Sequence, residues 1–153
     1  MKWKHPSVTK IYEAIGAVAD GRVEVSGDTA KIYSSSGNKY YDVSYDSISS
    51  SIMSNDNSSY WQSYLGYPAI AYLLKIGVLK YESHLGDLLK GIAWKDINQK
   101  FKNDFDKALK HILGSLNESD VKKLESYVES LNTNIISLDL SVLGSKIKPP
   151  EGY

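Results

Sequence analysis

The sequence contains no cysteine, and this absence excludes disulfide bonds, thiol catalysis and cysteine-ligated metal sites. It also lacks a long hydrophobic run, because the longest apolar stretch, residues 67–74, is far shorter than the roughly 20 residues of a membrane-spanning helix. Residues 1–6 are not followed by the apolar core of a signal peptide. We therefore expect a soluble, cytoplasmic protein that does not contact a membrane.

Arginine is nearly absent as well, since Arg22 is the only arginine among 18 basic residues. Recognition of phosphate or guanine by a two-pronged donor usually recruits arginine, so a dedicated base-reading protein is disfavoured. Basic and acidic residues balance at 18 each, and no strong field steers the chain toward nucleic acid or membrane. The preference for lysine and the missing cysteine indicate an A/T-rich, thermophilic source.

Familiar catalytic and cofactor motifs are missing too. Neither a dinucleotide-binding glycine motif nor a nucleophile-elbow serine motif occurs, and the three histidines lie far apart. Gly86 and Gly91 have the outer spacing of a phosphate-binding loop, but Ile92 and Ala93 stand where Lys and Ser/Thr are required. We therefore predict no catalytic residue, no cofactor and no metal, and we leave open an enzyme of unfamiliar type.

The residues that are present suffice for one globular domain, because 42% of the 153 residues are hydrophobic. Apolar residues within 7–20 recur at helical spacing and precede Gly21, which predicts a first helix. Residues 22–26, 29–33 and 39–45 are β-rich and separated by turn residues, which predicts a three-stranded antiparallel meander. The first helix is the expected cover for the apolar face of that meander.

The predicted fold class is therefore α+β, with an N-terminal helix, a three-stranded antiparallel β-meander and a C-terminal helical subdomain. A serine-rich segment between sheet and helices has the composition of a surface loop, although Ile48, Ile52 and Met53 allow a short helix instead. Pro68 fits the first turn of a helix, where its missing N–H costs nothing. The expected parts of the single domain 1–153 are 1–46 (helix and meander), 47–59 (loop), 60–144 (helical subdomain, with helices over 60–65, 68–76, 82–90, 94–102 and 104–116) and 145–153 (extended tail).

The last helix is predicted to begin at the N-cap Ser119 and to end at Gly144. Its apolar residues form a heptad seam that consists of Val121, Leu124, Val128, Leu131, Ile135, Leu138 and Val142. Residues 136–142 also alternate with a period of two, so a closing strand is the alternative to the final turns. We favour packing of this helix within the domain over a homodimer, whose seam would be Leu124, Val128, Leu131 and Ile135.

Two surface clusters are candidate binding sites. The first is aromatic and consists of Tyr60, Trp61, Tyr64 and Tyr67, in which the three tyrosines would share one side of a helix. A core whose tyrosine hydroxyls reach solvent is the favoured alternative, because tyrosine (12 residues) is the ordinary aromatic residue of this chain. The second lies in a helical pair over 90–111 and consists of possible nucleic-acid contacts, namely Lys95, Lys100, Lys102, Lys107 and Lys110.

That helical pair faintly resembles a helix-turn-helix, but Asn98 and Lys102 stand where the motif has a small residue and a glycine. We therefore favour an ordinary solvated pair of helices.

Two stretches resemble known families. The segment YWQSYLGYPAIAYLLKIG with LLKGIAWKDIN, within residues 60–98, resembles small conserved hypothetical proteins of thermophilic archaea without an assigned activity. A hairpin over 30–45 followed by a helix over 68–74 resembles the SWIM-type ββα module. Gly66 and Pro68 stand where that module has zinc-binding Cys and His, so the resemblance implies a metal-free relative.

Taken together, these patterns favour a protein of unknown function that acts as a non-enzymatic binding or assembly module. It would contact itself, as a possible homodimer, or a protein partner through residues 60–67 or the last helix. The alternative is a weak, sequence-nonspecific nucleic-acid binder that uses the helical pair over 90–111 and is released by salt.

Overall fold

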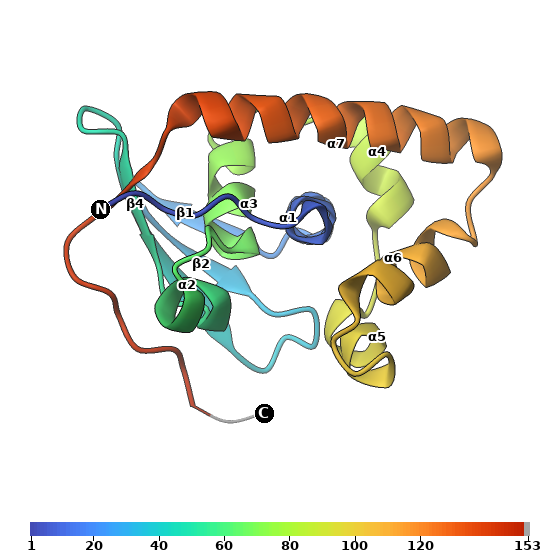
Figure 1. Cartoon of the computed structure of the whole chain (residues 1–153), viewed down its shortest axis with the longest axis horizontal. Coiled ribbons are helices and arrows are strands. Elements are labelled where there is room, and N and C mark those ends of the chain that lie inside the picture. The colour runs from blue at the N-terminus through green and yellow to red at the C-terminus, as the bar shows by residue number, and fades with distance from the viewer. Residues whose placement is uncertain (152–153) are drawn as a thin grey trace.

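The computed structural model describes residues 1–151, in which helices surround one side of a five-stranded sheet (Figure 1). Four strands are antiparallel and follow one another in chain order, and the fifth joins β4 in the parallel direction. The strands are β1 (Val23–Ser26), β2 (Thr29–Tyr33), β3 (Tyr40–Asp46), β4 (Ser51–Ser54) and β5 (Ser141–Val142). The mixed α+β class and the three strands of the meander are confirmed, but the sheet has two further strands.

The serine-rich segment 47–59 is not a surface loop. It contains β4, whose four residues are all buried, and the start of helix α2 (Asn57–Gln62). The alternative of a short helix was also wrong, because Ile52 and Met53 lie in β4 and Ile48 is 97% exposed in a turn. Serine misled the prediction because a short hydroxyl side chain is tolerated in a buried strand wherever it finds a hydrogen-bond partner.

The buried face of the sheet is covered by α3 (Tyr67–Lys75), not by α1 (Val8–Ala19) as the sequence predicted. Val23, Ile32 and Tyr41 are cross-strand partners and are buried on this face. All residues of α3 from 68 to 74 are buried, because the sheet covers one side of this helix and α1 packs on another. Pro68 lies in the first turn of α3, as predicted.

The helices between α3 and the last helix are shorter than predicted. They are α4 (Ser83–Gly86), the 3-10 helix η1 (Asp87–Leu89), α5 (Trp94–Lys100) and α6 (Phe105–Leu113). Lys102 and Asn103 both adopt positive φ angles, which end the helical run between α5 and α6. The predicted helix over 94–102 therefore stops two residues early.

The last helix, α7 (Glu118–Leu138), begins earlier than the predicted Ser119 and ends earlier than the predicted Gly144. Its N-cap is Asn117 and not Ser119, because the Asn117 side chain accepts a hydrogen bond of 2.8 Å from the Asp120 N–H. Asp139 adopts the left-handed conformation and ends the helix, and residues 141–142 form β5 beside β4. The heptad seam therefore stops at Leu138, and the strand alternative is correct only for two residues.

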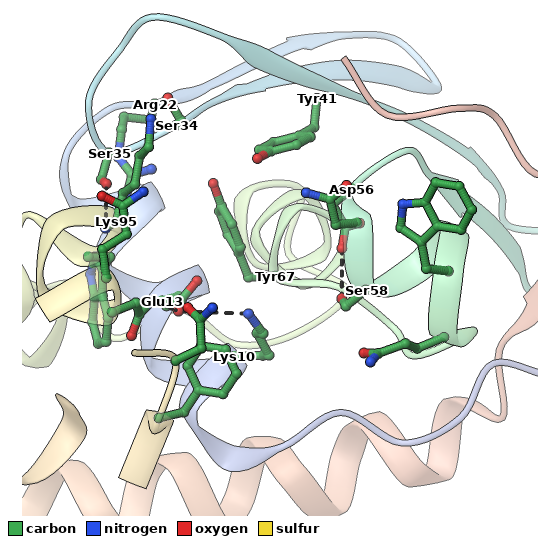
Figure 2. A pocket seen from close by; sticks show the side chains of 18 residues that line it. Lys10, Glu13, Arg22, Ser34, Ser35, Tyr41, Asp56, Ser58, Tyr67 and Lys95 are labelled. Atoms are coloured by element: carbon green, nitrogen blue, oxygen red, sulfur yellow. Dashed lines mark hydrogen bonds and ion pairs between the residues drawn. The ribbon is translucent and has the colours of Figure 1, made fainter. Parts of the chain in front are cut away.

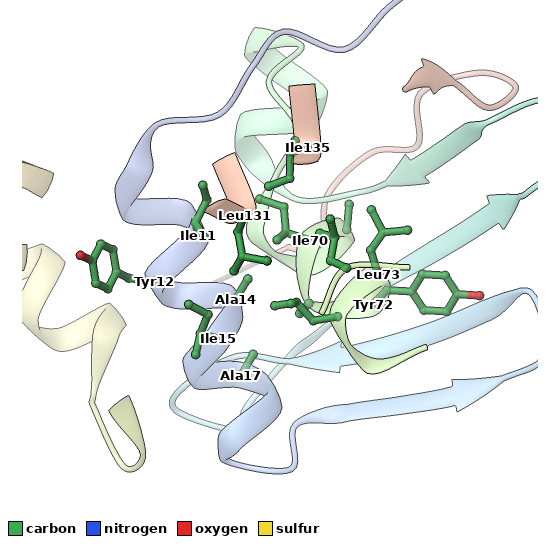
Figure 3. Close-up of a cluster of buried hydrophobic side chains, with 14 of the residues drawn as sticks. Ile11, Tyr12, Ala14, Ile15, Ala17, Ile70, Tyr72, Leu73, Leu131 and Ile135 are labelled. Atoms are coloured by element: carbon green, nitrogen blue, oxygen red, sulfur yellow. The ribbon is translucent and has the colours of Figure 1, made fainter. Parts of the chain in front are cut away.

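The predicted dimer seam lies inside the chain's own core. Its side chains are between 0% and 4% exposed, and α7 packs on α1; they are Leu124, Val128, Leu131 and Ile135. Figure 3 shows side chains of α1, α3 and α7 meeting in this apolar cluster. Packing within the domain, the favoured alternative, is what the structure shows for these residues.

The C-terminal tail has no regular structure over residues 145–151. It is attached through Lys146, whose Nζ donates to the Ser63 hydroxyl and to the Tyr60 carbonyl oxygen. Ile147 is 49% exposed, and Tyr153 lies outside the described residues. Over residues 1–151, none of the helices combines the length and apolarity needed to cross a bilayer.

Candidate functional site

A cavity of about 660 Å³ opens between α1, the β2–β3 turn, α2, the start of α3 and α5 (Figure 2). Its lining combines aromatic rings with many polar side chains. The aromatic members are Tyr41, Trp61, Tyr67, Trp94 and Phe105, and the amide members are Asn57, Gln62, Asn98, Gln99 and Asn103. The charged members are Lys10, Glu13, Arg22, Asp56 and Lys95, and the hydroxyl members are Ser34, Ser35 and Ser58.

Asp56 is a buried carboxylate at one end of the cavity, with 6% of its surface exposed. Its oxygens accept from the hydroxyls of Ser54 (2.6 Å), Ser58 (2.8 Å) and Ser59 (2.7 Å), and from the Ser59 N–H (3.3 Å). The residue is thereby the N-cap of α2. Gly66 packs directly against it, since a Cβ there would lie 2.1 Å from Asp56 Oδ2. The serine-rich segment therefore serves to bury and bind one carboxylate.

Glu13 is a second buried carboxylate, 5% exposed, and it projects from α1. Its Oε1 accepts from Asn98 Nδ2 at 2.9 Å, and Lys10 Nζ lies 3.9 Å from the same oxygen. The Lys10 ammonium also lies 4.6 Å from the centre of the Phe105 ring. A carboxylate only accepts hydrogen bonds, so the Asn98 amide nitrogen must face it. The Asn98 Oδ1 is left buried and has no partner within residues 1–151.

Arg22 is at the opposite end of the cavity from Asp56 (Figure 2). Its Nε donates to Asp20 Oδ2 at 3.2 Å and its Nη1 donates to the Tyr33 carbonyl oxygen at 2.8 Å. Nearby, the Lys95 backbone N–H donates to Ser35 Oγ at 3.1 Å, which joins the start of α5 to the β2–β3 turn. The single arginine of the chain therefore lines the cavity and, through its own two hydrogen bonds, also connects the segments that form the wall.

Tyr67 projects into the cavity between these two ends (Figure 2). Burial, and then the carboxylates of Glu13 and Asp56, raise the pKa of the Tyr67 hydroxyl far above its usual value. The Arg22 guanidinium acts in the opposite direction, but it does not cancel the effect of burial. The Tyr67 ring meets the Tyr41 ring edge to face, with centroids 6.1 Å apart. Tyr67 therefore offers a neutral hydroxyl at any physiological pH.

The structure separates the predicted aromatic cluster. The sequence predicted that Tyr60, Tyr64 and Tyr67 share one side of a helix. They do not, because Ser63 has a φ of 62° and ends α2. Trp61 and Tyr67 line the cavity, and Tyr60 packs edge to face on Trp61 with centroids 4.7 Å apart. Tyr64 lies outside the lining, with the Lys4 ammonium 5.4 Å from its ring centre.

Of the predicted nucleic-acid contacts, only Lys95 lines the cavity. The other four are exposed side chains on α5, on α6 or between them, namely Lys100, Lys102, Lys107 and Lys110. Lys107 lies 3.9 Å from the Asp104 carboxylate, which is the N-cap of α6.

Sequence reasoning missed most of the cavity, including Glu13, Asp56, Asn98 and Arg22. Two signals were present. Glu13 is the only charged residue between Ile11 and Ala19, in a helix whose apolar residues leave almost no solvated side. Asp56 has the residue type of an N-cap. The contact of Glu13 with α5 joins residues 85 positions apart, which no local pattern encodes.

Within the described residues, no three His, Asp or Glu side chains gather closely enough to hold a metal ion. A family model described as "Uncharacterised conserved protein UCP014422" matches residues 3–141. No curated protein and no solved structure matches the chain. The predicted resemblance to conserved hypothetical proteins is confirmed at this level. The thermophilic archaeal source and the SWIM-type resemblance stay predictions.

Proposed function

Because the chain belongs to the uncharacterised conserved protein family UCP014422, whose description gives no activity, we propose a function from the cavity: it binds a small polar organic molecule. The supporting observation is that two buried carboxylates and five aromatic rings line one cavity of about 660 Å³. Ligand sites typically occupy about 300–1,000 Å³ and combine aromatic walls with a few convergent polar groups.

A structural role accounts for Asp56 better than for Glu13. Burial of a carboxylate is unfavourable unless hydrogen bonds compensate for the lost water, and apolar side chains of the same volume would pack at least as stably. Most other buried positions of the described residues hold apolar side chains. Asp56 has such compensation, since it is the N-cap of α2 and accepts four hydrogen bonds. In the part of the chain that the structure describes, Glu13 accepts only the bond from Asn98, and we take its burial in the cavity wall as support for a molecule that it recognises.

The three tryptophans make this proposal directly testable by ¹⁵N NMR of their indole N–H groups. Trp61 and Trp94 line the cavity, whereas the Trp3 indole N–H donates to the Ile52 carbonyl oxygen at 2.8 Å, outside the lining. We would titrate a mixed panel of sugars, nucleosides, nucleotides, amino acids and small organic acids. At least one compound should shift the Trp61 and Trp94 signals saturably while Trp3 stays in place.

The proposal fails if no compound of the panel moves Trp61 or Trp94 at millimolar concentration. It also fails if every shift is centred on Trp3. Mass spectrometry of the small molecules released from the denatured protein gives an independent check, because a tight ligand would be purified with the chain.

Assembly through a protein partner, which the sequence favours, remains our second proposal. It is supported by the exposed rings of Trp61 (68% exposed) and Tyr64 (40% exposed), since exposed aromatic side chains are enriched at interfaces. Light scattering behind size exclusion, at low and high salt, tests the self-association version. A strict monomer at high protein concentration contradicts that version.

Nucleic-acid binding through the helical pair stays a prediction, and no contact in the structure adds to it. Retention on DNA or RNA that falls as salt rises is the expected result. Absent or salt-independent retention removes it.

A further inference from the structure

The charged groups that line the cavity are already paired within the chain. Arg22 donates to Asp20 at 3.2 Å, and Lys10 Nζ lies 3.9 Å from Glu13. Asp56 accepts four hydrogen bonds from serine groups. The remaining cation, Lys95, also has an interaction partner. A ligand with a net charge would have to displace one of these partners, so an uncharged ligand is favoured.

Two acceptors of the cavity wall nevertheless have hydrogen-bond capacity that these pairs leave unused. The Asn98 Oδ1 is buried and has no partner among the described residues. The neighbouring Glu13 carboxylate has capacity for about four hydrogen bonds, and Asn98 Nδ2 supplies one of them. A buried acceptor without a donor is unfavourable, and a ligand hydroxyl would supply the missing donor. Two acceptors side by side match two neighbouring hydroxyl groups.

Aromatic rings line the same cavity as these acceptors. Phe105 and Trp94 are lining residues together with Asn98, and Tyr67 projects into the cavity (Figure 2). Aromatic faces carry partial negative charge, so they pack favourably on groups with a weakly positive surface, such as the C–H groups of a saturated ring that bears hydroxyls. Hydroxyl groups and ring C–H groups occur together in sugars.

We infer that the ligand is an uncharged ring compound with neighbouring hydroxyls, a sugar or the ribose of a nucleoside, and that Glu13 and Asn98 bind two of these hydroxyls. This inference rests on the proposed function of the cavity. It adds the chemical class of the ligand and the two side chains that recognise it.

The test compares matched ligands by the same indole NMR titration. Glucose, galactose, maltose and adenosine are the uncharged probes, and glucose 6-phosphate and glucosamine are their charged relatives. 2-Deoxyglucose and 2′-deoxyadenosine lack one of the neighbouring hydroxyls. We expect saturable binding of at least one uncharged probe, and binding at least tenfold weaker for its charged or deoxygenated relative.

Two variants locate the recognition. Glu13→Gln keeps the shape of the side chain, and Asn98→Ala removes the unpaired Oδ1 while Glu13 remains. Each should weaken binding of the best probe about tenfold or more. Glu129→Gln, an exposed residue of α7 outside the lining, is the control and should bind as the wild type does. An unchanged Trp3 signal shows that a variant is folded.

The outcomes separate this inference from the proposed function. If a charged compound binds at least as tightly as its uncharged relative, the cavity is a ligand site but the inferred class is wrong. If removal of a hydroxyl, Glu13→Gln and Asn98→Ala all leave the affinity unchanged, the assignment of the two side chains is wrong. If no sugar or nucleoside shifts Trp61 or Trp94 although another compound of the mixed panel does, the inference also falls and the proposed function stands.

Discussion

Helix α1 has two buried sides that obey different rules. One side places Ile11 and Ile15 against α3 and α7 in the apolar core (Figure 3). The other side turns Lys10 and Glu13 toward the cavity (Figure 2). The side chains of the first side pack against apolar neighbours, and those of the second side form polar contacts. We therefore assign the first side to stability and the second to recognition.

The two sides should respond differently to substitution. A buried apolar side chain contributes through the area that it removes from water and through its contacts, so its truncation costs stability in full. A buried hydrogen-bonded group returns only about 0.5–1.5 kcal/mol net, because the unfolded chain bonds to water instead. The expected effects on unfolding are therefore largest in the core and smallest at the rim of the cavity.

Leu131→Ala should give the largest effect. Leu131 is 1% exposed and lies in the core between α7 and α1, so its truncation should cost about 2–5 kcal/mol. Urea denaturation measures this loss. Ile136→Ala on the same helix is the control, because Ile136 is 58% exposed and should change stability by less than about 0.5 kcal/mol.

Equal losses for the two α7 variants would contradict the placement of Leu131 in the core. Light scattering on the same samples also tests the predicted homodimer. A wild-type dimer that becomes a folded monomer on Leu131→Ala would show that α7 is an interface instead.

Gly66→Ala should have the next largest effect, and it acts on the polar side. Gly66 has a φ of −83°, which alanine adopts without strain, so the whole effect comes from the Cβ that would lie 2.1 Å from Asp56 Oδ2. Overpacking of this kind costs about 1–3 kcal/mol. The displaced carboxylate would also release its serine partners and the N-terminus of α2.

A double-mutant cycle with Asp56→Ala checks the cause of that loss by urea denaturation. Because Asp56→Ala removes the clashing oxygens, the double variant should be more stable than the sum of the two single losses implies. Additive losses would mean that Gly66 and Asp56 are not coupled.

Alkaline pH should produce a smaller effect, through Tyr12 of α1. Burial, and then the charge of Glu125, raise the pKa of Tyr12 to about 12. A pKa that is higher in the folded state stabilises the protein fully below the ordinary tyrosine value of about 10, and this contribution is lost as pH rises toward 12. The urea midpoint should therefore fall between pH 10 and 12.

Tyr12→Phe should make that fall less steep while it leaves the midpoint at pH 8 nearly unchanged. The fall should not vanish, because burial also raises the pKa of Tyr127 to about 12. An identical slope in the wild type and the variant would show that Tyr12 does not contribute to the alkaline loss.

The sequence predicted the elements whose evidence is local. Periodicity placed α1 and most of α7, alternation placed β1 to β3, and Pro68 marked the start of α3. Local evidence does not determine the order of layers, because an apolar helix fits against a sheet or against another helix equally well. The roles of α1 and α3 were therefore exchanged, and the buried strand β4 was mistaken for a loop.

The cavity was predicted less well for a related reason. Trp61, Tyr67 and Lys95 were among the candidate residues, but they were assigned to two unrelated surfaces. The carboxylates Glu13 and Asp56 come from segments that carry no catalytic or binding motif. They line one cavity only because the fold brings α1, α2 and α5 around it. Asp56 is bound by its own neighbours in sequence, but hydrogen bonds between distant segments join α5 to Glu13 and to the β2–β3 turn, and single-sequence patterns do not encode those bonds.

Trp61→Ala should have the smallest effect on stability and still a clear effect on binding. Trp61 is 68% exposed, so its loss should change the free energy of unfolding by less than about 0.5 kcal/mol. Its ring forms part of the cavity rim, and a stacked aromatic ring contributes about 0.5–1.5 kcal/mol, so affinity for the best probe should fall by roughly two- to tenfold.

Tyr64→Ala, a 40% exposed neighbour outside the lining, is the control and should change neither quantity. If both variants bind as the wild type does, the recognition surface lies deeper, around Glu13 and Asn98. If Trp61→Ala instead unfolds the chain, the rim belongs to the core and the distinction between the two sides of α1 is lost there.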